Sequence, residues 1–166
     1  MRPPAEESSL REALSRWPSG VTVVTTADRA DRPRGFTATS FSSLSSSPPL
    51  VLVCLDLGAE CRSTFERAEA FAVHILGRGQ RELALRFATR GADKFTGAPT
   101  APGLAGIPLF DGTAARLECR LQECLPGGDH LILIGRVERV SLGEEQPLLY
   151  HQREFHELPS PAFTGS

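Results

Sequence analysis

The sequence predicts a mainly β protein, an antiparallel barrel decorated with a few short helices. Short apolar and β-branched segments outnumber helical ones, and short turns join several of them. The strict alternation of strand and helix that marks a parallel doubly wound sheet is absent from the chain. An antiparallel barrel therefore fits the pattern better than an α/β fold.

Length and composition indicate one soluble, cytoplasmic domain. The chain has 166 residues, 40% of them hydrophobic and 23% charged, which is ordinary for a globular protein. A net charge of −2 argues against a nucleic-acid partner. The polar start of the chain is unlike a signal peptide, and no apolar run is long enough to span a membrane. The cysteines form no CxxC pair, so a disulfide is possible but not indicated and no zinc site is expected.

The first 60 residues predict one helix and three strands. Residues 1–8 are expected to be a flexible tail, and a capping box of Ser9 and Glu12 predicts a helix that ends before Pro18. Its apolar residues share one face: Leu10, Ala13, Leu14 and Trp17. Strands are expected at 21–26, from residue 36 onward after a polar turn at 27–35, and at 50–55.

The rest of the chain predicts two further helices and four strands. A second capping box, Ser63 with Glu66, opens a short helix to about residue 68, and a buried strand follows at 70–76. A helix is expected at 80–87, an irregular loop at 96–112 and a half-buried strand at 115–122. The "GGDH" turn at 127–130 predicts a hairpin into a strand at 131–140. One more short strand and a flexible tail at 159–166 end the chain.

Common catalytic signatures are missing from the sequence. It contains no GxSxG, no P-loop and no GxGxxG. His74 lies in an apolar strand, where a hydrogen-bonded core histidine is the default, and His151 and His156 are expected to be solvated. What remains is the hydroxyl-rich stretch "GFTATSFSSLSSSPPL", residues 35–50.

This hydroxyl-rich stretch allows two interpretations. As a flexible linker it would bind no ligand. As a strand it would offer hydroxyl and backbone donors to a flat, polar ligand. Alternation would then give one face Thr37, Thr39, Phe41 and Ser43, and the other face Phe36, Ala38, Ser40 and Ser42.

The stretch "GFTATSFSSLSSSPPLVLVCL" resembles the signature of the short-chain flavin reductases, which have the FMN-binding split-barrel fold, an antiparallel, Greek-key-like barrel. The resemblance extends over about Leu10 to Leu158, because "WPSGVTVVTT", "FAVHIL", "LALRFATRGADKF", "LECRLQECLPGGDHLILIGRV" and "PLLYHQREFHEL" follow in the family's order. It implies one domain over residues 9–158. It is closest to the reductases that supply monooxygenases tailoring aromatic polyketides.

The resemblance implies a set of flavin-binding residues. They are Thr37, Ala38, Thr39, Ser40, Ser45, Cys54, Leu55, Asp56, Ser63, Thr64, Phe87, Ala88 and Arg90. Thr39 stands where the family more commonly has Ser. Ser63 and Thr64 match positions near the ribityl phosphate, although Ser63 could be only a helix cap. Arg90 could add charge-assisted hydrogen bonds to a phosphate, or be an ordinary cation at a helix C-terminus.

The implied reaction is hydride transfer from NADH or NADPH to FMN, with FAD possible. His130, in a Gly-Asp-His sequence that resembles the family's, is expected to face the nicotinamide, and Tyr150 is expected nearby. Hydride passes between two stacked rings, so no general base is needed. The resemblance further implies a homodimer and a separate flavin-dependent monooxygenase. Two rivals are a flavin-binding module without reductase activity and a pyridoxamine-phosphate-oxidase-like enzyme.

Overall fold

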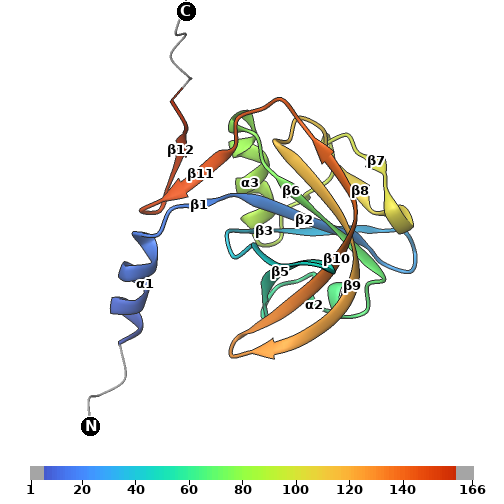
Figure 1. The fold of residues 1–166 in the computed structure, drawn as a ribbon, viewed down its shortest axis with the longest axis horizontal. Helices are drawn as coiled ribbons and strands as arrows, with labels where there is room; N and C mark the ends of the chain where they lie inside the picture. Colours follow the sequence, from blue (N-terminus) through green and yellow to red (C-terminus); the bar gives the residue numbers. More distant parts are fainter. Residues whose placement is uncertain (1–5, 160–166) are drawn as a thin grey trace, which may run out of the picture.

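A computed structural model describes residues 6–159, which form a mainly antiparallel β protein with three short α-helices (Figure 1). The predicted fold class is confirmed. Most of the two predicted tails, residues 1–5 and 160–166, lies outside the described residues. No helix within residues 6–159 combines the length and the apolarity needed to cross a membrane.

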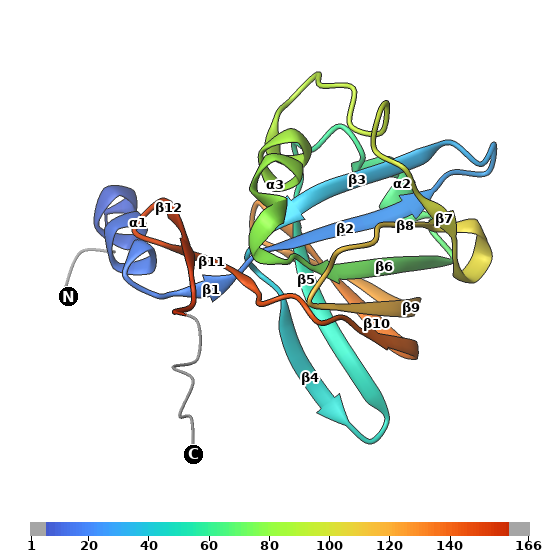
Figure 2. The ribbon, with the colours of Figure 1, turned by 90° about the horizontal axis from the view of Figure 1, so that it is seen from above.

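Seven antiparallel strands form the main sheet, and its two edge strands do not pair with each other within the described part of the chain. Figure 2 shows the edge strands β3 and β4 at opposite ends of the curved sheet. The barrel is therefore split between them. In spatial order the strands are β3 (Pro33–Ala38), β2 (Thr22–Ala27), β6 (Ala70–Ile75), β9 (Ala115–Gly127), β10 (His130–Leu142), β5 (Pro49–Asp56) and β4 (Ser42–Ser46).

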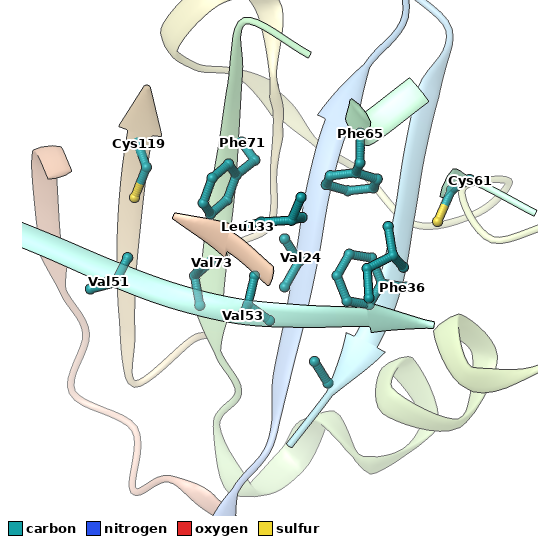
Figure 3. Packing of buried hydrophobic residues seen from close by; sticks show 12 residues of the cluster. Val24, Phe36, Val51, Val53, Cys61, Phe65, Phe71, Val73, Cys119 and Leu133 are labelled. Carbon is teal, nitrogen blue, oxygen red and sulfur yellow. The ribbon is translucent and has the colours of Figure 1, made fainter. Parts of the chain in front are cut away.

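The concave side of this sheet encloses the main hydrophobic core (Figure 3). Val24, Phe71 and Leu133 are completely buried there, and the rings of Phe36 and Phe65 meet edge-on at 5.0 Å. Burial of side chains of this size stabilises the fold by about 1.5–3 kcal/mol each. The apolar strand runs in the sequence thus become the inner wall of the barrel.

Two helices pack on the barrel. α3 (Arg81–Ala88), preceded by the 3-10 turn η1 (Arg78–Gln80), buries Ala84 and Phe87 in a second apolar cluster. α2 (Arg62–Glu66) is a single short helix that buries Phe65. Each helix is thus anchored to the barrel through its buried apolar residues.

Four elements from the two ends of the described chain form an arm outside the barrel (Figures 1 and 2). We use "the arm" for α1 (Glu7–Ser15), β1 (Ser19–Gly20), β11 (Leu148–His151) and β12 (Glu154–Glu157). The three strands form a small sheet in the order β1-β11-β12. The single C-terminal strand that the sequence predicts is therefore a hairpin.

The predicted capping boxes are wrong. α1 begins at Glu7, with Glu6 as the N-cap, so Ser9 lies inside the helix. α2 begins at Arg62, with Cys61 as the N-cap, so Ser63 also lies inside its helix. Neither N-cap residue makes a side-chain capping bond. An acidic residue in the first turn of α1 suits the helix dipole and favours the earlier start.

The hydroxyl-rich stretch is not one strand. β3 ends at Ala38 and β4 begins at Ser42, so the chain bends between them and the predicted alternation of faces does not continue through Ser43. The predicted loop at 96–112 is mostly irregular. It also holds β7 (Ala101–Pro102), β8 (Pro108–Leu109) and the 3-10 turn η2 (Leu104–Gly106).

Candidate functional site

A pocket of about 370 Å³, here called the central pocket, opens where β3 and β5 end at the split in the barrel. It brings together eleven of the fifteen residues that the resemblance implied. They are Thr37, Ala38, Thr39, Ser40, Cys54, Leu55, Asp56, Phe87, Ala88, Arg90 and His130. They come from β3, β5, β10 and α3 or from the residues just after these elements, segments far apart in the sequence.

Ser40 joins the two sides of the split. Its hydroxyl donates to the Cys54 carbonyl at 3.2 Å and accepts the Cys54 N–H at 3.1 Å. These two bonds connect the end of β3 to β5, which no backbone ladder joins to it. The single Ser40 proton is already used, so this residue shapes the pocket wall.

The two threonines differ in what they leave for a ligand. The hydroxyl of Thr37 donates to the Ala84 carbonyl at 2.6 Å and ties β3 to α3. Thr39 is exposed, and its hydroxyl has no protein partner among residues 6–159. Of the hydroxyl groups at the end of β3, that of Thr39 is therefore the donor left open to the pocket.

His130 lies at the rim of the central pocket because of a tight hairpin. Gly128, at φ 65°, turns the chain from β9 into β10, whose first residue, His130, pairs with Asp56 on β5. Nδ1 of His130 lies 2.7 Å from an oxygen of Asp129. This hydrogen bond and the imidazole charge hold the pKa of Asp129 below its usual range. The bond occupies Nδ1 and leaves Nε2 as the ring atom that can meet a ligand.

The C-terminal end of α3 forms the opposite wall. Phe87 is buried, and its ring packs edge-on against Phe95 at 5.0 Å and against Phe110 at 5.5 Å. Arg90 is exposed and donates to the Gly58 carbonyl at 3.0 Å, which links this wall to the turn after β5. Arg90 therefore bonds to the turn after β5 rather than to the C-terminal carbonyls of α3, which was the alternative considered from the sequence.

Lys94 also lines the central pocket and was missed by sequence reasoning. Its Nζ lies 3.5 Å from the Gly35 carbonyl. Burial raises the pKa of the neighbouring Cys61 thiol, and the charges of Lys94 and Arg34 act against that rise. Lys94 is the one lysine among 18 basic residues, a bias toward arginine that could have drawn attention to it.

Four of the implied residues lie outside the central pocket. Ser63 and Thr64 line a second depression of about 710 Å³, the arginine pocket, between α2 and the turn joining β2 to β3. Tyr150 lines a third, of about 590 Å³, the tyrosine pocket, which shares Thr37, Thr39 and Ala88 with the central pocket. Ser45 lies on β4 opposite Leu50 and lines none of the three.

The central pocket suits a flat ring with polar edges. Small side chains of Ala38 and Ala88 leave room between its walls, and Thr39 offers a donor. Arg90 and Lys94 bring two cations to its lining, which also holds the carboxylates of Asp56 and Glu60. Burial raises the pKa of Cys61, so its thiol is poorly suited to act as a nucleophile. The geometry therefore favours the binding and positioning of a ring over covalent catalysis.

A split antiparallel barrel with a ring-sized pocket at its split defines a class of flavin-binding proteins. The flavin reductase-like domain family matches residues 14–159, and the chain belongs to that family. It is 43% identical over 159 residues to the actinorhodin polyketide dimerase of Streptomyces coelicolor, over 95% of this chain and 90% of that protein.

Other relatives carry reductase names. The NADH:riboflavin 5'-phosphate oxidoreductase of Streptomyces pristinaespiralis is 39% identical, over 96% of this chain and 92% of that protein. The reductase component of a 4-hydroxyphenylacetate 3-monooxygenase from Thermus thermophilus is 41% identical, over 94% and 99%. The NADH:FAD oxidoreductase of Streptomyces globisporus, solved with NAD and FAD fragments, superposes with a TM-score of 0.89 at 35% identity, over 98% of each chain.

Proposed function

We propose that the protein is an NAD(P)H:flavin oxidoreductase that transfers hydride from a reduced nicotinamide to FMN or FAD. The observation that carries the proposal is the convergence of β3, β5, α3 and His130 on one pocket. The names of the relatives support it over a flavin-binding module without reductase activity.

The side chains of the pocket would bind and position the two rings. A bound flavin supplies the hydride acceptor, so the protein needs no acid or base at the reacting atoms. Thr39 would donate to the polar edge of the ring. Arg90 and Lys94 would stabilise the negative charge that a flavin gains on reduction. His130 would orient the nicotinamide through Nε2, while Asp129 fixes its ring.

The decisive experiment is anaerobic reduction of FMN and FAD by NADH and by NADPH. We expect catalytic loss of flavin absorbance near ~450 nm with one of the two nicotinamides. Binding of flavin without reduction by either nicotinamide would establish the binding-module alternative instead. Formation of an aldehyde from pyridoxamine phosphate would establish the oxidase-like alternative.

Replacement of His130 tests the assignment of the nicotinamide side. His130→Ala should raise the KM for the nicotinamide or lower kcat by about 10-fold, equal to 1.4 kcal/mol, while the flavin Kd stays nearly unchanged. His156→Ala is the matched control, because His156 is exposed on β12 of the arm. An equal loss of flavin affinity in His130→Ala would place His130 in the wrong subsite.

We further infer that the protein acts as a cytoplasmic homodimer and passes reduced flavin to a separate flavin-dependent monooxygenase. The relative named as a monooxygenase reductase component supports the oxygenase partner. The exposed apolar face of α1 supports association of two copies. The four cysteines, all within the described residues, are free thiols, as expected in a reducing compartment.

A further inference from the structure

Two side chains on neighbouring strands hold both backbone polar groups of Phe110. His74 on β6 and Arg116 on β9 are paired in register. Nε2 of His74 accepts the Phe110 N–H at 3.1 Å, and Nη1 of Arg116 donates to the Phe110 carbonyl at 3.1 Å. Phe110 lies just after β8, outside any strand, so these side chains fix a backbone that no strand partner holds. We call the two bonds the Phe110 clamp.

The clamp uses the neutral form of His74. Nδ1 lies 3.0 Å from the Val23 carbonyl, which can only accept, so the ring proton is on Nδ1 and Nε2 is an acceptor. Burial lowers the pKa of His74 from 6.5 to about 4, against the effect of the Val23 bond and with that of the Arg116 charge. Asp111, the acid next to Phe110, lies 3.6 Å from Arg116. At neutral pH, Nε2 is therefore available to the Phe110 N–H.

The ring of Phe110 belongs to a cluster of three aromatic rings. It lies parallel to the ring of Phe95, with centroids 5.9 Å apart, and meets the ring of Phe87 edge-on at 5.5 Å. Phe87 and Phe95 meet edge-on at 5.0 Å, so each ring contacts the other two. Interiors are close-packed, and a displacement of Phe110 would therefore remove support from both neighbours.

The cluster forms the support behind one wall of the central pocket. Phe87 lines this pocket, and so does Lys94, the residue before Phe95. On its other side Phe87 lies directly against β3, because a Cβ on Gly35 would be 2.6 Å from its ring. Phe87 is thus confined between β3 and Phe110. The position of Phe110 therefore decides where this part of the pocket wall lies.

We propose that His74 is a positioning residue for the flavin site: its Nε2 fixes the backbone of Phe110, whose ring holds Phe87 in the wall of the central pocket. This inference rests on the proposed function, because it takes the central pocket as the flavin site. His74 lines none of the three pockets described above, so its effect on a ligand there is indirect. From the sequence, it was expected only as a hydrogen-bonded core histidine; the clamp connects it to the site.

Two amide variants separate the two bonds of His74. In His74→Gln the side-chain amide reaches the place of Nε2 and accepts the Phe110 N–H. In His74→Asn it reaches the place of Nδ1 and keeps only the bond to Val23. Each variant loses one buried hydrogen bond, so both should lose stability by a similar amount, which urea unfolding measures.

The readouts are the hydrogen exchange of the Phe110 amide, followed by NMR, and the Kd for FMN, from quenching of its fluorescence without nicotinamide. His74→Asn should expose the Phe110 amide to exchange and raise the Kd about 10-fold, while His74→Gln should stay within about 2-fold of the wild type. His156→Asn and His156→Gln are the controls, because His156 is exposed on β12, and they should change neither readout.

Arg116 gives a second test that leaves both His74 bonds in place. Arg116→Met removes the donor to the Phe110 carbonyl, keeps a side chain of similar length, and should also raise the Kd for FMN. An unchanged Kd in this variant would show that the clamp does not control the pocket wall.

Equal Kd values in the two His74 variants would overturn the inference, because a purely structural role would make FMN affinity follow the stability that each variant loses. A Phe110 amide that exchanges in His74→Asn while the Kd stays at the wild-type value would overturn it as well. Failure of the proposed function is distinct, since the wild type would then bind FMN without reducing it, and the comparison of Kd values uses no nicotinamide.

Discussion

The barrel and the arm use the same kind of apolar pattern with opposite results. In the barrel, Phe65 and Phe71 are completely buried. In the arm, Leu14 on α1 and Trp17 just after this helix are 62% and 76% exposed, and α1 buries none of its residues. Periodicity thus identifies which side chains share a face, but the rest of the fold decides what that face contacts.

The difference lies in how each region is attached. All strands of the main sheet except the edge strands β3 and β4 pair with neighbours on both sides, and the sheet encloses its own apolar side chains (Figure 3). The arm is joined to the barrel by backbone bonds at Leu148, whose N–H donates to the Leu76 carbonyl at 2.8 Å and whose carbonyl accepts the Val21 N–H at 3.2 Å. The hairpin of the arm also packs Leu148, Tyr150 and Phe155 against the second apolar cluster, while the apolar side chains of α1 remain without cover from the described chain.

The largest effect is expected from truncation in the barrel core. Phe71→Ala should lower the free energy of unfolding by about 3–5 kcal/mol, because it removes a completely buried ring and leaves a cavity. Val140→Ala is the control on the same sheet, since Val140 is 58% exposed, and it should change stability by no more than about 0.5 kcal/mol. Urea unfolding measures both. Similar losses in the two variants would mean that burial does not distinguish these positions.

A buried histidine should make the barrel sensitive to acid. His74 Nδ1 donates to the Val23 carbonyl at 3.0 Å, and Nε2 accepts the Phe110 N–H at 3.1 Å. Burial lowers the pKa of His74 from 6.5 to about 4; the Val23 bond acts against this shift and the charge of Arg116 adds to it. In the unfolded chain His74 takes up its proton near pH 6.5, and in the folded chain only near pH 4.

Stability should therefore be complete above pH 6.5 and fall as the pH drops from 6.5 to about 4. The total loss from His74 is about 3 kcal/mol, from 1.36 kcal/mol per pKa unit. His74→Gln should flatten the unfolding free energy in this window, measured by denaturant titration at several pH values. His156→Gln, an exposed histidine, is the control. An unchanged slope in His74→Gln would show that His74 is not the group responsible.

A glycine beside the central pocket should give the next largest effect. A Cβ on Gly35 would lie 2.6 Å from the Phe87 ring and 2.8 Å from the Val24 carbonyl, so Gly35→Ala should cost about 1–3 kcal/mol of stability. Phe87 lines the pocket, so flavin affinity should fall as well. Gly79→Ala has no atom within 4 Å of the added methyl and should be nearly neutral. Thermal unfolding measures the stability of both variants, and flavin titration measures their affinity. Equal stability and equal flavin affinity in the two variants would contradict this prediction.

The strands of the barrel could be predicted because the apolar residues that form its core also mark the strands in the sequence. The half-buried strand at 115–122 and the "GGDH" turn both appear where expected, in β9 and the β9–β10 hairpin, although burial in β9 does not alternate, since neighbouring Glu118 and Cys119 are both buried. The capping boxes at Ser9 and Ser63 could not be trusted, because a Ser-x-x-Glu sequence inside a helix looks the same as one at its start. Local sequence thus identified elements better than their ends.

The candidate site was predictable only where the resemblance supplied positions. Composition did not reveal that the Ser40 and Thr37 hydroxyls would be used by backbone groups, because their partners, Cys54 and Ala84, are distant in sequence. The arginine pocket was missed for the same reason. Its walls come from the β2–β3 turn, α2 and the loop around Ala105, which only the folded barrel brings together.

The smallest effect on stability is expected in the arm, where apolar side chains are most exposed and differ most from those of the barrel. Leu14→Gln with Trp17→Gln should change the unfolding free energy of the monomer by no more than about 0.5 kcal/mol, because both side chains are already mostly exposed. The same double variant should shift the monomer–dimer equilibrium toward monomer in sedimentation velocity if α1 contacts a second copy. Ser8→Gln, a change at an exposed α1 residue that removes no apolar side chain, is the control for the helix itself. A wild type that is dimeric, and a double variant equally dimeric, would place the dimer contact elsewhere, and the exposed face of α1 would then need another partner.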